Sequence, residues 1–175
     1  EYYQHPDGRL EKLKTPGVDT GMGLERLAMV SQKKKNIFET DLFVPLENAL
    51  PENAEPRIRR IVLDHMKASV FLITDGVRPS NKEQGYVLRR VLRRAMAYAK
   101  VNNFPGEGPK ELIEKIVHLY KVCYPELEKN KKIILETIYE EREKFAKTLV
   151  GGLKQLEKMK EADAKEAFRL YETYG

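Results

Sequence analysis

Apolar residues at helical spacing, separated by short breaker runs, restrict the fold of this sequence more than any other feature. One such segment begins at Pro56 and continues to the run DGVRPSNKEQG, and a second is expected at about 83–101. Further helices are expected at 24–30, in KELIEKIVHLYKVCY, from about Pro125 onward and in ADAKEAFRLYETYG. The turn residues HPDG between short strand-like segments predict a hairpin. The expected fold class is mainly α with a short antiparallel β-hairpin.

Three local signals refine this expectation. The stretch VDTGMGLERLAMV is typical of a strand that runs into a helix, and two glycines in the first helical turn would each cost roughly 1 kcal/mol. The pair Gly151–Gly152 is expected to interrupt the long helix that starts near Pro125, by bending or splitting it. Asp163 is a candidate N-cap for the last helix.

The composition fits a soluble protein with one core, or one core and a smaller appendage, since 41% of the 175 residues are hydrophobic. No apolar run approaches the roughly 20 residues that cross a bilayer, and the polar start EYYQHPDGR has no leader features. We therefore expect a cytoplasmic protein with no membrane partner. Cys123 cannot form a disulfide within the chain and is expected to be a buried thiol, and the three histidines lack ligand-like spacing, so no protein-held metal is expected.

Basic charge is concentrated in the middle of the chain, where residues 57–100 hold 11 basic and 3 acidic side chains. Such a block indicates a polyanionic partner, most simply nucleic acid. On a helical wheel for 83–101, one face is apolar and an opposite arc of about 140° is basic. The apolar face contains Leu88, Val91, Leu92, Ala95 and Ala99, and the basic arc contains Arg89, Arg90, Arg93 and Arg94.

The four arginines favour contact with phosphate groups. Glu83 is the single acid of this helix, which argues against pairing within it, and the guanidinium group is well shaped for phosphate. The alternative is a solvated face that is balanced by acids elsewhere in the fold.

Four segments carry a resemblance to a known family. VDTGMGLER, ETDLF at 39–43, LDHMKASVFLITDGVRPSN and GYVLRRVLRRA occur in this order, and together they resemble the alanyl-tRNA synthetases, which are class II aminoacyl-tRNA synthetases. The resemblance implies that 1–50 is the C-terminal part of a catalytic domain with motif 3, at the edge of its antiparallel sheet. It implies that 51–175 is a helical tRNA-recognition domain. The remaining catalytic motifs would lie before Glu1, and editing and C-terminal domains after Gly175.

The implied reaction joins alanine to ATP, releases pyrophosphate and transfers the alanyl group to the 3′ end of tRNA(Ala). By resemblance Arg26 would hold the γ-phosphate of ATP, which enters with Mg²⁺ as a substrate, and Asp19 would bind the α-ammonium group of alanine. Gly21 would leave room for this small substrate. Gly23 belongs to the same glycine-rich entry to the helix, which lets a ligand come close to the backbone at the positive end of the helix dipole. The alternative is an ordinary turn in which Asp19 caps the helix and Arg26 forms a surface ion pair. The chain by itself is predicted to be inactive.

The resemblance also implies recognition of the tRNA acceptor stem. Asn81 and Glu172 lie where an asparagine and an aspartate of the family read a G·U wobble pair, and the glutamate is longer than the aspartate by one methylene. The RNA minor groove is shallow enough for such side chains, and the arginine face would contact the acceptor-stem backbone. The alternatives are an Asn that bonds within its own loop and a Glu on a solvated helical turn.

Two other functions remain open at this point. The chain could be a non-catalytic helical RNA-binding module derived from a synthetase, or a structural helical domain whose charges serve solubility. The residues indicate no oligomeric state.

Overall fold

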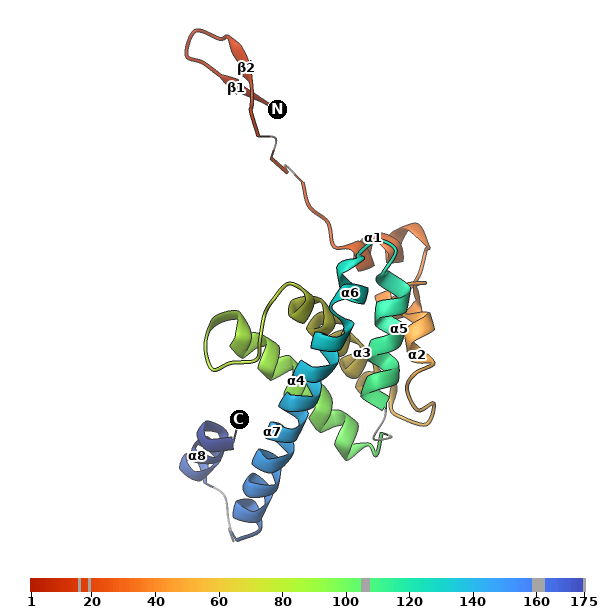
Figure 1. Cartoon of the computed structure of the whole chain (residues 1–175), viewed down its shortest axis with the longest axis vertical. Coiled ribbons are helices and arrows are strands. Elements are labelled where there is room, and N and C mark those ends of the chain that lie inside the picture. The colour runs from red at the N-terminus through yellow and green to blue at the C-terminus, as the bar shows by residue number, and fades with distance from the viewer. Residues whose placement is uncertain (16, 19, 105–107, 159–162, 175) are drawn as a thin grey trace. The chain divides into compact units, whose positions relative to one another are not determined.

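The computed structural model describes residues 1–15, 17–18, 20–104, 108–158 and 163–174. The chain forms two compact units, Glu1–Asp41 and Leu42–Gly175, and Figure 1 traces their elements from the hairpin to α8. The predicted division at residues 50 and 51 separates functions and not compact units, so the domains 1–50 and 51–175 stay a prediction.

The first unit begins with a hairpin. Strands β1 (Tyr2–Gln4) and β2 (Leu10–Lys12) pair antiparallel. The His5 N–H donates to the Arg9 carbonyl at 2.9 Å and closes the turn. The hairpin predicted around HPDG is therefore confirmed. All six strand residues are exposed, so its order comes from turn and ladder hydrogen bonds and not from a core.

The short helix α1 (Leu24–Ser31) follows, and then the 3-10 helix η1 (Ile37–Glu39). The predicted strand before α1 is wrong, because the described residues between Gly17 and Gly23 form no strand. Gly23 is the N-cap of α1 with an extended backbone. Both glycines of the motif thus precede the helix, and the expected cost of glycine inside a helical turn does not arise, because glycine is an acceptable N-cap.

In the second unit, every regular element among the described residues is a helix. Its elements are α2 (Val44–Glu47), α3 (Pro56–Thr74), α4 (Glu83–Val101), α5 (Gly108–Tyr120), α6 (Glu126–Lys129), α7 (Lys131–Lys158) and α8 (Ala164–Tyr174). The predicted class, mainly α with a short β-hairpin, is confirmed, and so are the helix from Pro56 and the helix at 83–101.

The core lies between α3 and α4, with α5 and α7 packed against α3 (Figure 1). Leu63 of α3, Leu92 of α4 and Ile134 of α7 are fully buried. The predicted apolar face of α4 is confirmed for Leu88 as well, which has no exposed surface. Burying one such side chain stabilises a fold by about 1.5–3 kcal/mol, so these helices form a true hydrophobic core.

The C-terminus of α3 is closed by a Schellman motif. Gly76 has a φ of 91°, its N–H donates to the Ile73 carbonyl at 3.1 Å, and the Val77 N–H donates to the Leu72 carbonyl at 3.0 Å. The Arg78 guanidinium also donates to the Ile73 carbonyl, at 3.0 Å. These contacts satisfy carbonyls that have no partner within the helix, and they fix where the following loop begins.

The long C-terminal helix departs from the prediction. The helix expected from Pro125 breaks at Asn130, between α6 and α7, where the Asn130 side chain donates to the Thr74 carbonyl at 3.4 Å. The predicted split at Gly151–Gly152 is wrong, since α7 continues through both glycines, and the alternative of a bend there stays a prediction. Glycine is costly in a helix but can adopt helical angles, and the neighbouring residues favour the helix.

Two smaller expectations have different outcomes. Asp163 accepts the Glu166 N–H at 2.7 Å, so the predicted N-cap of α8 is confirmed. Cys123 is exposed, so the expected buried thiol is wrong. It lies just after α5, beyond the apolar face that this helix turns to the core.

Candidate nucleic-acid interface

The loop from Asp75 to Lys82 joins α3 to α4 and carries Asn81, the predicted base-reading residue. Ser80 Oγ donates to the Lys82 carbonyl at 2.9 Å. The Ser80 N–H donates to the Gly85 carbonyl at 3.0 Å. The loop therefore folds back onto the first turn of α4 and leaves the Asn81 side chain exposed.

Gly85 permits this close approach. A Cβ atom at Gly85 would lie closer than 3.0 Å to Ser80 Oγ and to the Arg78 carbonyl oxygen. A backbone carbonyl cannot rotate away as a side chain can, so glycine is required here for the loop to keep its position. Sequence reasoning did not single out Gly85 for this role, although a glycine inside a helical pattern can signal a close packing contact.

The four predicted arginines of α4 differ in their surroundings. Arg89 and Arg93 are half-buried, whereas Arg90 and Arg94 are exposed. Residues four apart lie close together along a helix, so each pair forms its own short row. The single face that the helical wheel predicts is thus two rows with different exposure.

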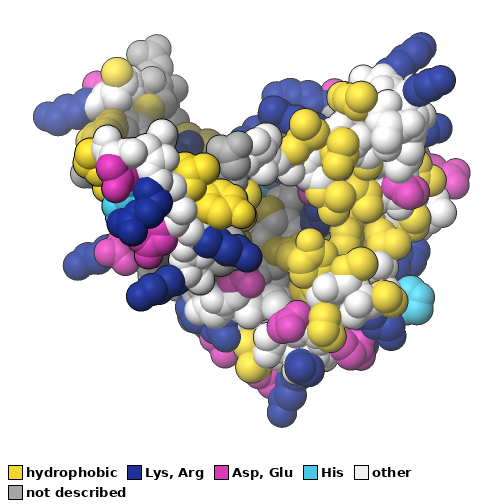
Figure 2. Space-filling model, turned by 90° about the horizontal axis from the view of Figure 1, so that it is seen from above, with side chains coloured by type: hydrophobic (Ala, Val, Ile, Leu, Met, Phe, Trp, Pro, Cys, Tyr) yellow, Lys and Arg dark blue, Asp and Glu magenta, His cyan; other side chains and the backbone are white. Residues whose placement is uncertain are grey.

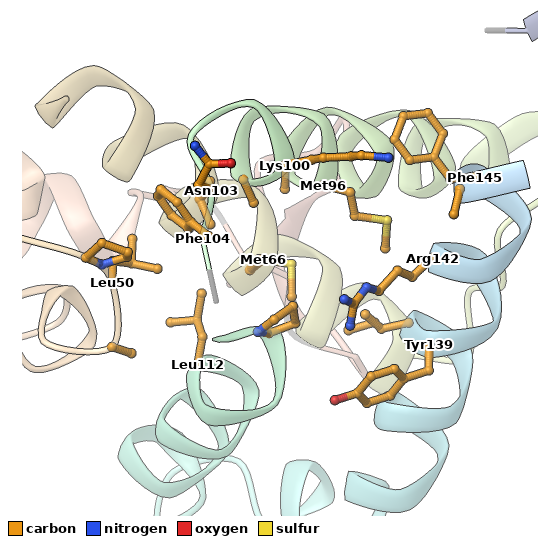
Figure 3. A pocket seen from close by; sticks show the side chains of 18 of the residues that line it. Leu50, Met66, Met96, Lys100, Asn103, Phe104, Leu112, Tyr139, Arg142 and Phe145 are labelled. Atoms are coloured by element: carbon orange, nitrogen blue, oxygen red, sulfur yellow. The ribbon is translucent and has the colours of Figure 1, made fainter. Parts of the chain in front are cut away.

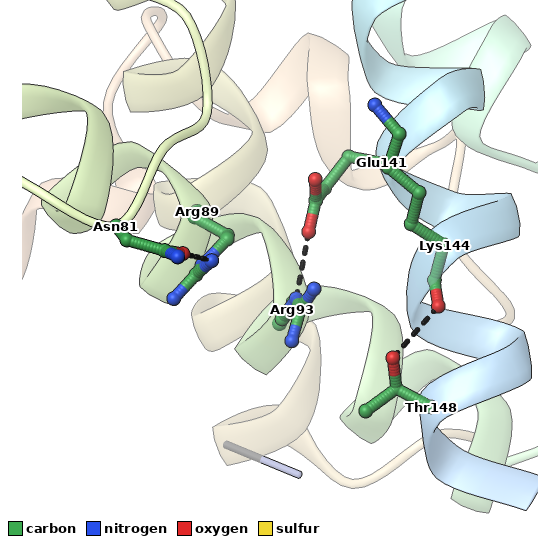
Figure 4. Close-up of polar contacts among 6 residues, drawn as sticks. All are labelled: Asn81, Arg89, Arg93, Glu141, Lys144 and Thr148. Carbon is green, nitrogen blue, oxygen red and sulfur yellow. Dashed lines mark hydrogen bonds and ion pairs between the residues drawn. The ribbon is translucent and has the colours of Figure 1, made fainter. Parts of the chain in front are cut away.

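Arg93 is paired inside the fold. Its Nε donates to Glu141 Oε1 of α7 at 2.7 Å, and the Glu141 side chain is only 5% exposed (Figure 4). The Arg93 guanidinium also lies 5.5 Å from the centre of the Phe145 ring. The partner of Arg93 comes from another helix, so for this arginine the alternative of balance by an acid elsewhere in the fold is met. Contact of Arg93 with RNA stays a prediction.

Arg89 contacts Asn81, and the structure thus brings two predicted site residues together. Arg89 Nη1 donates to Asn81 Oδ1 (Figure 4). Arg89 also lies 6.0 Å from the centre of the Tyr86 ring. A guanidinium can only donate, so the amide oxygen of Asn81 faces Arg89 and its NH₂ group is turned elsewhere.

Arg90 and Arg94 form the outer row. Among the described residues, no acidic side chain forms an ion pair with either one. Arg94 lies 5.9 Å from the centre of the Tyr98 ring. Figure 2 shows Lys and Arg side chains at several places on one face of the molecule, so exposed basic charge is not limited to α4. Arg90 and Arg94 are nevertheless available to an anionic partner.

The predicted substrate residues belong to the first unit. Arg26 is exposed in the first turn of α1. A Cβ atom at Gly21 or Gly23 would have no neighbour within 4 Å, so no packing contact of the described residues requires glycine at these positions. Asp19 lies outside the described residues. The roles of all four in binding alanine and ATP stay predictions.

Glu172, the second predicted base reader, is part of α8, which contacts α7. Its side chain is outside those that the structure describes.

A cavity of about 370 Å³ lies among α3, α4, α5 and α7. Figure 3 shows apolar side chains such as Met66, Met96 and Leu112 around it, with Lys100 and Arg142 among its polar members. No predicted site residue lines this cavity. It is a gap in the helix packing that is separate from the loop and the arginine rows.

Neither a metal site nor a membrane span is found among the described residues. Within this part of the chain, no group of three or more His, Cys, Asp or Glu side chains is placed to hold a metal ion. None of the helices described here combines the length and apolar character that crossing a membrane requires.

The sequence model of the family described as tRNA synthetases class II (A) matches residues 1–175. The chain therefore belongs to this family of class II tRNA synthetases. Its curated relatives include an alanine–tRNA ligase of Herpetosiphon aurantiacus, 38% identical over 191 residues, and one of Elusimicrobium minutum, 40% identical over 188 residues. A third, from Thermotoga sp., is 37% identical. Each alignment covers 100% of this chain but 22% of the relative, so the chain spans about a fifth of their length.

Proposed function

We propose that the protein containing this chain is an alanine–tRNA ligase, which activates alanine with ATP and transfers the alanyl group to the 3′ end of tRNA(Ala). The observation that carries the proposal is the similarity of the complete chain to proteins named alanine–tRNA ligase, within a class II synthetase family. The chain contributes two parts to this activity, one toward ATP and alanine and one toward the tRNA.

The first part is assigned to the start of α1. The exposed Arg26 binds the γ-phosphate of ATP, because a guanidinium can donate two parallel hydrogen bonds to phosphate oxygens. Asp19 binds the α-ammonium group of alanine, and Gly21 and Gly23 let the substrates approach the backbone. Mg²⁺ arrives with ATP as part of the substrate, and no ligand for it is assigned to this chain.

The second part is assigned to the loop before α4, to α4 itself and to α8. Asn81 and Glu172 read a G·U wobble pair in the acceptor stem, and exposed arginines of α4 bind the phosphate backbone. A wobble pair leaves the guanine 2-amino group free in the minor groove of RNA, where side chains reach base edges. A carboxylate accepts from this group, and an asparagine can donate to neighbouring acceptors.

The activation step is tested by alanine-dependent ATP–pyrophosphate exchange in the full-length protein that contains this chain. Arg26→Ala should lower the exchange rate by about ten- to a hundred-fold, because a hydrogen bond to a charged group contributes about 1.5–3 kcal/mol. Arg9→Ala is the matched control, because Arg9 is also exposed in the first unit. An unchanged rate in Arg26→Ala would remove Arg26 from the site.

The same assay separates the proposal from its rival, a non-catalytic RNA-binding module. One observation favours this rival. The arginine rows lie in the second unit and Arg26 lies in the first, so the RNA-binding residues belong to a different compact unit from the residue assigned to ATP. Absence of alanine-dependent exchange in the full-length wild type, together with RNA binding, would establish the rival. The chain 1–175 alone should show no exchange, because residues that act as a unit lose activity together when some of them are missing.

Acceptor-stem recognition is tested by aminoacylation of tRNA with a G·U or a G·C pair. Asn81→Ala should lower kcat/KM for the G·U tRNA by roughly 1–3 kcal/mol of transition-state stabilisation and leave pyrophosphate exchange intact. Glu172→Ala should have the same effect if the carboxylate accepts from guanine. Asn53→Ala is the control, since Asn53 is an exposed loop asparagine elsewhere in the second unit. Equal charging of both tRNAs by the wild type would contradict the assignment.

A further inference from the structure

We propose that the four arginines of α4 have two different tasks. Arg89 and Arg93 are positioning residues, which orient Asn81 and hold α4 against α7, whereas Arg90 and Arg94 supply the contacts with RNA phosphates. This inference rests on the proposed function, because it concerns how the acceptor stem is bound.

The helix geometry separates the two rows. At 3.6 residues per turn, the row of Arg89 and Arg93 lies about 100° around the helix from the row of Arg90 and Arg94. The first row borders the face on which Leu88 and Leu92 are buried, and the second row lies nearly opposite that face. This placement explains why the first row is half-buried and the second is exposed.

The two arginines of the first row both contact other side chains of the protein. Arg93 donates to Glu141 at 2.7 Å, and Glu141 is 5% exposed, so a phosphate could replace this partner only if a carboxylate were left buried without its cation. Figure 4 shows Arg93 directed toward α7 and Arg89 directed toward Asn81. Each guanidinium therefore already has a hydrogen-bond acceptor within the protein.

The contact of Arg89 has a consequence for recognition. Since Arg89 donates to Asn81 Oδ1, the amide is held with its oxygen toward α4. The NH₂ group of Asn81 is then the side that faces a ligand, and it can donate to a base or ribose acceptor in the minor groove. Arg89 thus determines which hydrogen-bonding group the loop offers, although it need not touch the RNA.

The second row has the features of backbone binding. Arg90 and Arg94 are exposed, and no ion-paired acid restrains either of them in the part of the chain that the structure describes. Binding weakens as salt is added, and each phosphate contact makes the negative slope of log K against log salt concentration steeper by about 0.7–0.9. The magnitude of this slope is called the salt slope. The two tasks therefore differ in a quantity that can be measured.

The test uses the full-length protein and two measurements on each variant. The first is the salt dependence of binding to a hairpin RNA with the acceptor-stem G·U pair, and the second is the ratio of kcat/KM for charging G·U and G·C tRNA. Lys132→Ala is the matched control, because Lys132 is a basic residue on α7 that is 87% exposed and outside both rows.

Arg90→Ala and Arg94→Ala should each lower the salt slope by about 0.7–0.9 and leave the G·U to G·C ratio unchanged. Arg89→Ala should leave the slope at the wild-type value and lower the ratio about tenfold, in line with the loss of one base contact. In the Asn81→Ala background, Arg89→Ala should lower the ratio no further, because it acts through Asn81. Lys132→Ala should match the wild type in both measurements.

Arg93 is tested together with its partner, since Arg93→Ala alone would leave Glu141 buried without a cation. Arg93→Met combined with Glu141→Leu replaces the pair by apolar side chains of similar size, which commonly preserves a fold. The salt slope of this double variant should equal that of the wild type. A slope lower by about 0.7–0.9 would show that Arg93 binds phosphate and would overturn its assignment.

The outcomes separate the inference from the proposed function. A wild type that charges both tRNAs equally would overturn the inference and the assigned G·U recognition, whereas absence of alanine-dependent exchange would overturn the ligase function itself. If the wild type prefers G·U, two results would overturn the inference and leave the proposed function standing. One is that Arg89→Ala weakens the salt dependence as much as Arg90→Ala does. The other is that Arg89→Ala lowers the G·U to G·C ratio by the same factor in the wild type and in the Asn81→Ala background.

Discussion

The two units of the chain differ in what stabilises them. Every hydrophobic side chain that is buried among the described residues belongs to Leu42–Gly175, and none belongs to Glu1–Asp41. Leu24 and Leu27 on α1 remain 47% and 49% exposed. Helices in proteins gain most of their stability from packing an apolar face. Apolar periodicity and turn residues thus predict secondary structure in both units, but only the second unit buries its apolar side chains in a hydrophobic core.

The largest effect is expected from a core leucine of the second unit. Leu63 has no exposed surface, so Leu63→Ala should lower the free energy of unfolding by about 2–5 kcal/mol, through lost burial and a new cavity. Leu27→Ala on α1 is the matched control and should cost less than about 1 kcal/mol. Urea denaturation of the chain, followed by circular dichroism, measures both. Equal losses would show that α1 is packed as firmly as α3.

The second prediction compares a buried acid with an exposed one. Glu141→Ala removes the partner of Arg93 and should cost about 3 kcal/mol, because the Arg93 side chain, which is only 19% exposed, is left without its acid. Glu11→Ala removes the 2.9 Å contact with His5 in the hairpin, where Glu11 is 61% exposed, and should cost less than about 1 kcal/mol.

The same urea denaturation measures both variants. Glu141→Gln keeps a hydrogen-bond acceptor and should fall between Glu141→Ala and the wild type. A loss for Glu141→Ala no larger than that for Glu11→Ala would mean that the Arg93–Glu141 pair does not hold α4 against α7.

The third prediction compares two glycines. Gly85→Ala should destabilise the second unit by about 1–3 kcal/mol, because the methyl group would collide with the Ser80 side chain and the Arg78 carbonyl. Gly21→Ala places a methyl group in open space and should change the free energy of unfolding by about 0.5 kcal/mol or less. Thermal unfolding of the two variants checks the difference. A Gly85→Ala protein as stable as Gly21→Ala would mean that the loop moves aside at little cost.

Features that depend on neighbouring residues could be predicted from the sequence. The HPDG hairpin, the bounds of α4 and the Asp163 cap follow from turn chemistry, apolar periodicity and capping preferences, each of which acts within a few residues. The same local reasoning placed Asn81 in an exposed loop before a helix, and the structure agrees.

Features that join distant segments could not be predicted in this way. Glu141 lies 48 positions from Arg93, and a helical wheel of one segment carries no information about the helix that packs beside it. The contact of Gly85 with Ser80 depends on how the loop folds back, and at the break the Asn130 side chain contacts a carbonyl of α3, which is 56 positions away. Tertiary contacts decide such positions, and they override local preference.

The smallest effect concerns an exposed contact of the second unit, between Asp64 and His65 on α3. His65 Nδ1 donates to Asp64 Oδ2 at 2.9 Å. This hydrogen bond lowers the pKa of the Asp64 carboxyl below its usual value, partial burial opposes the change, and the positive charges of His65 and Lys67 add to it. The Asp64 side chain is 53% exposed, so solvent weakens the interaction and the effect on stability should stay below about 1 kcal/mol.

The sign of the pH dependence follows from the direction of this pKa shift. Because the carboxyl of Asp64 has a lower pKa in the folded state than its unfolded value of about 3.9, ionised Asp64 stabilises the fold above that pH. The contribution is lost as the pH falls through the lowered pKa. The difference in unfolding free energy between the wild type and Asp64→Asn should therefore be present at about pH 6 and shrink toward about pH 3. In the His65→Ala background Asp64→Asn should have almost no effect at either pH, and a difference that persists there would assign the stabilisation to another partner of Asp64.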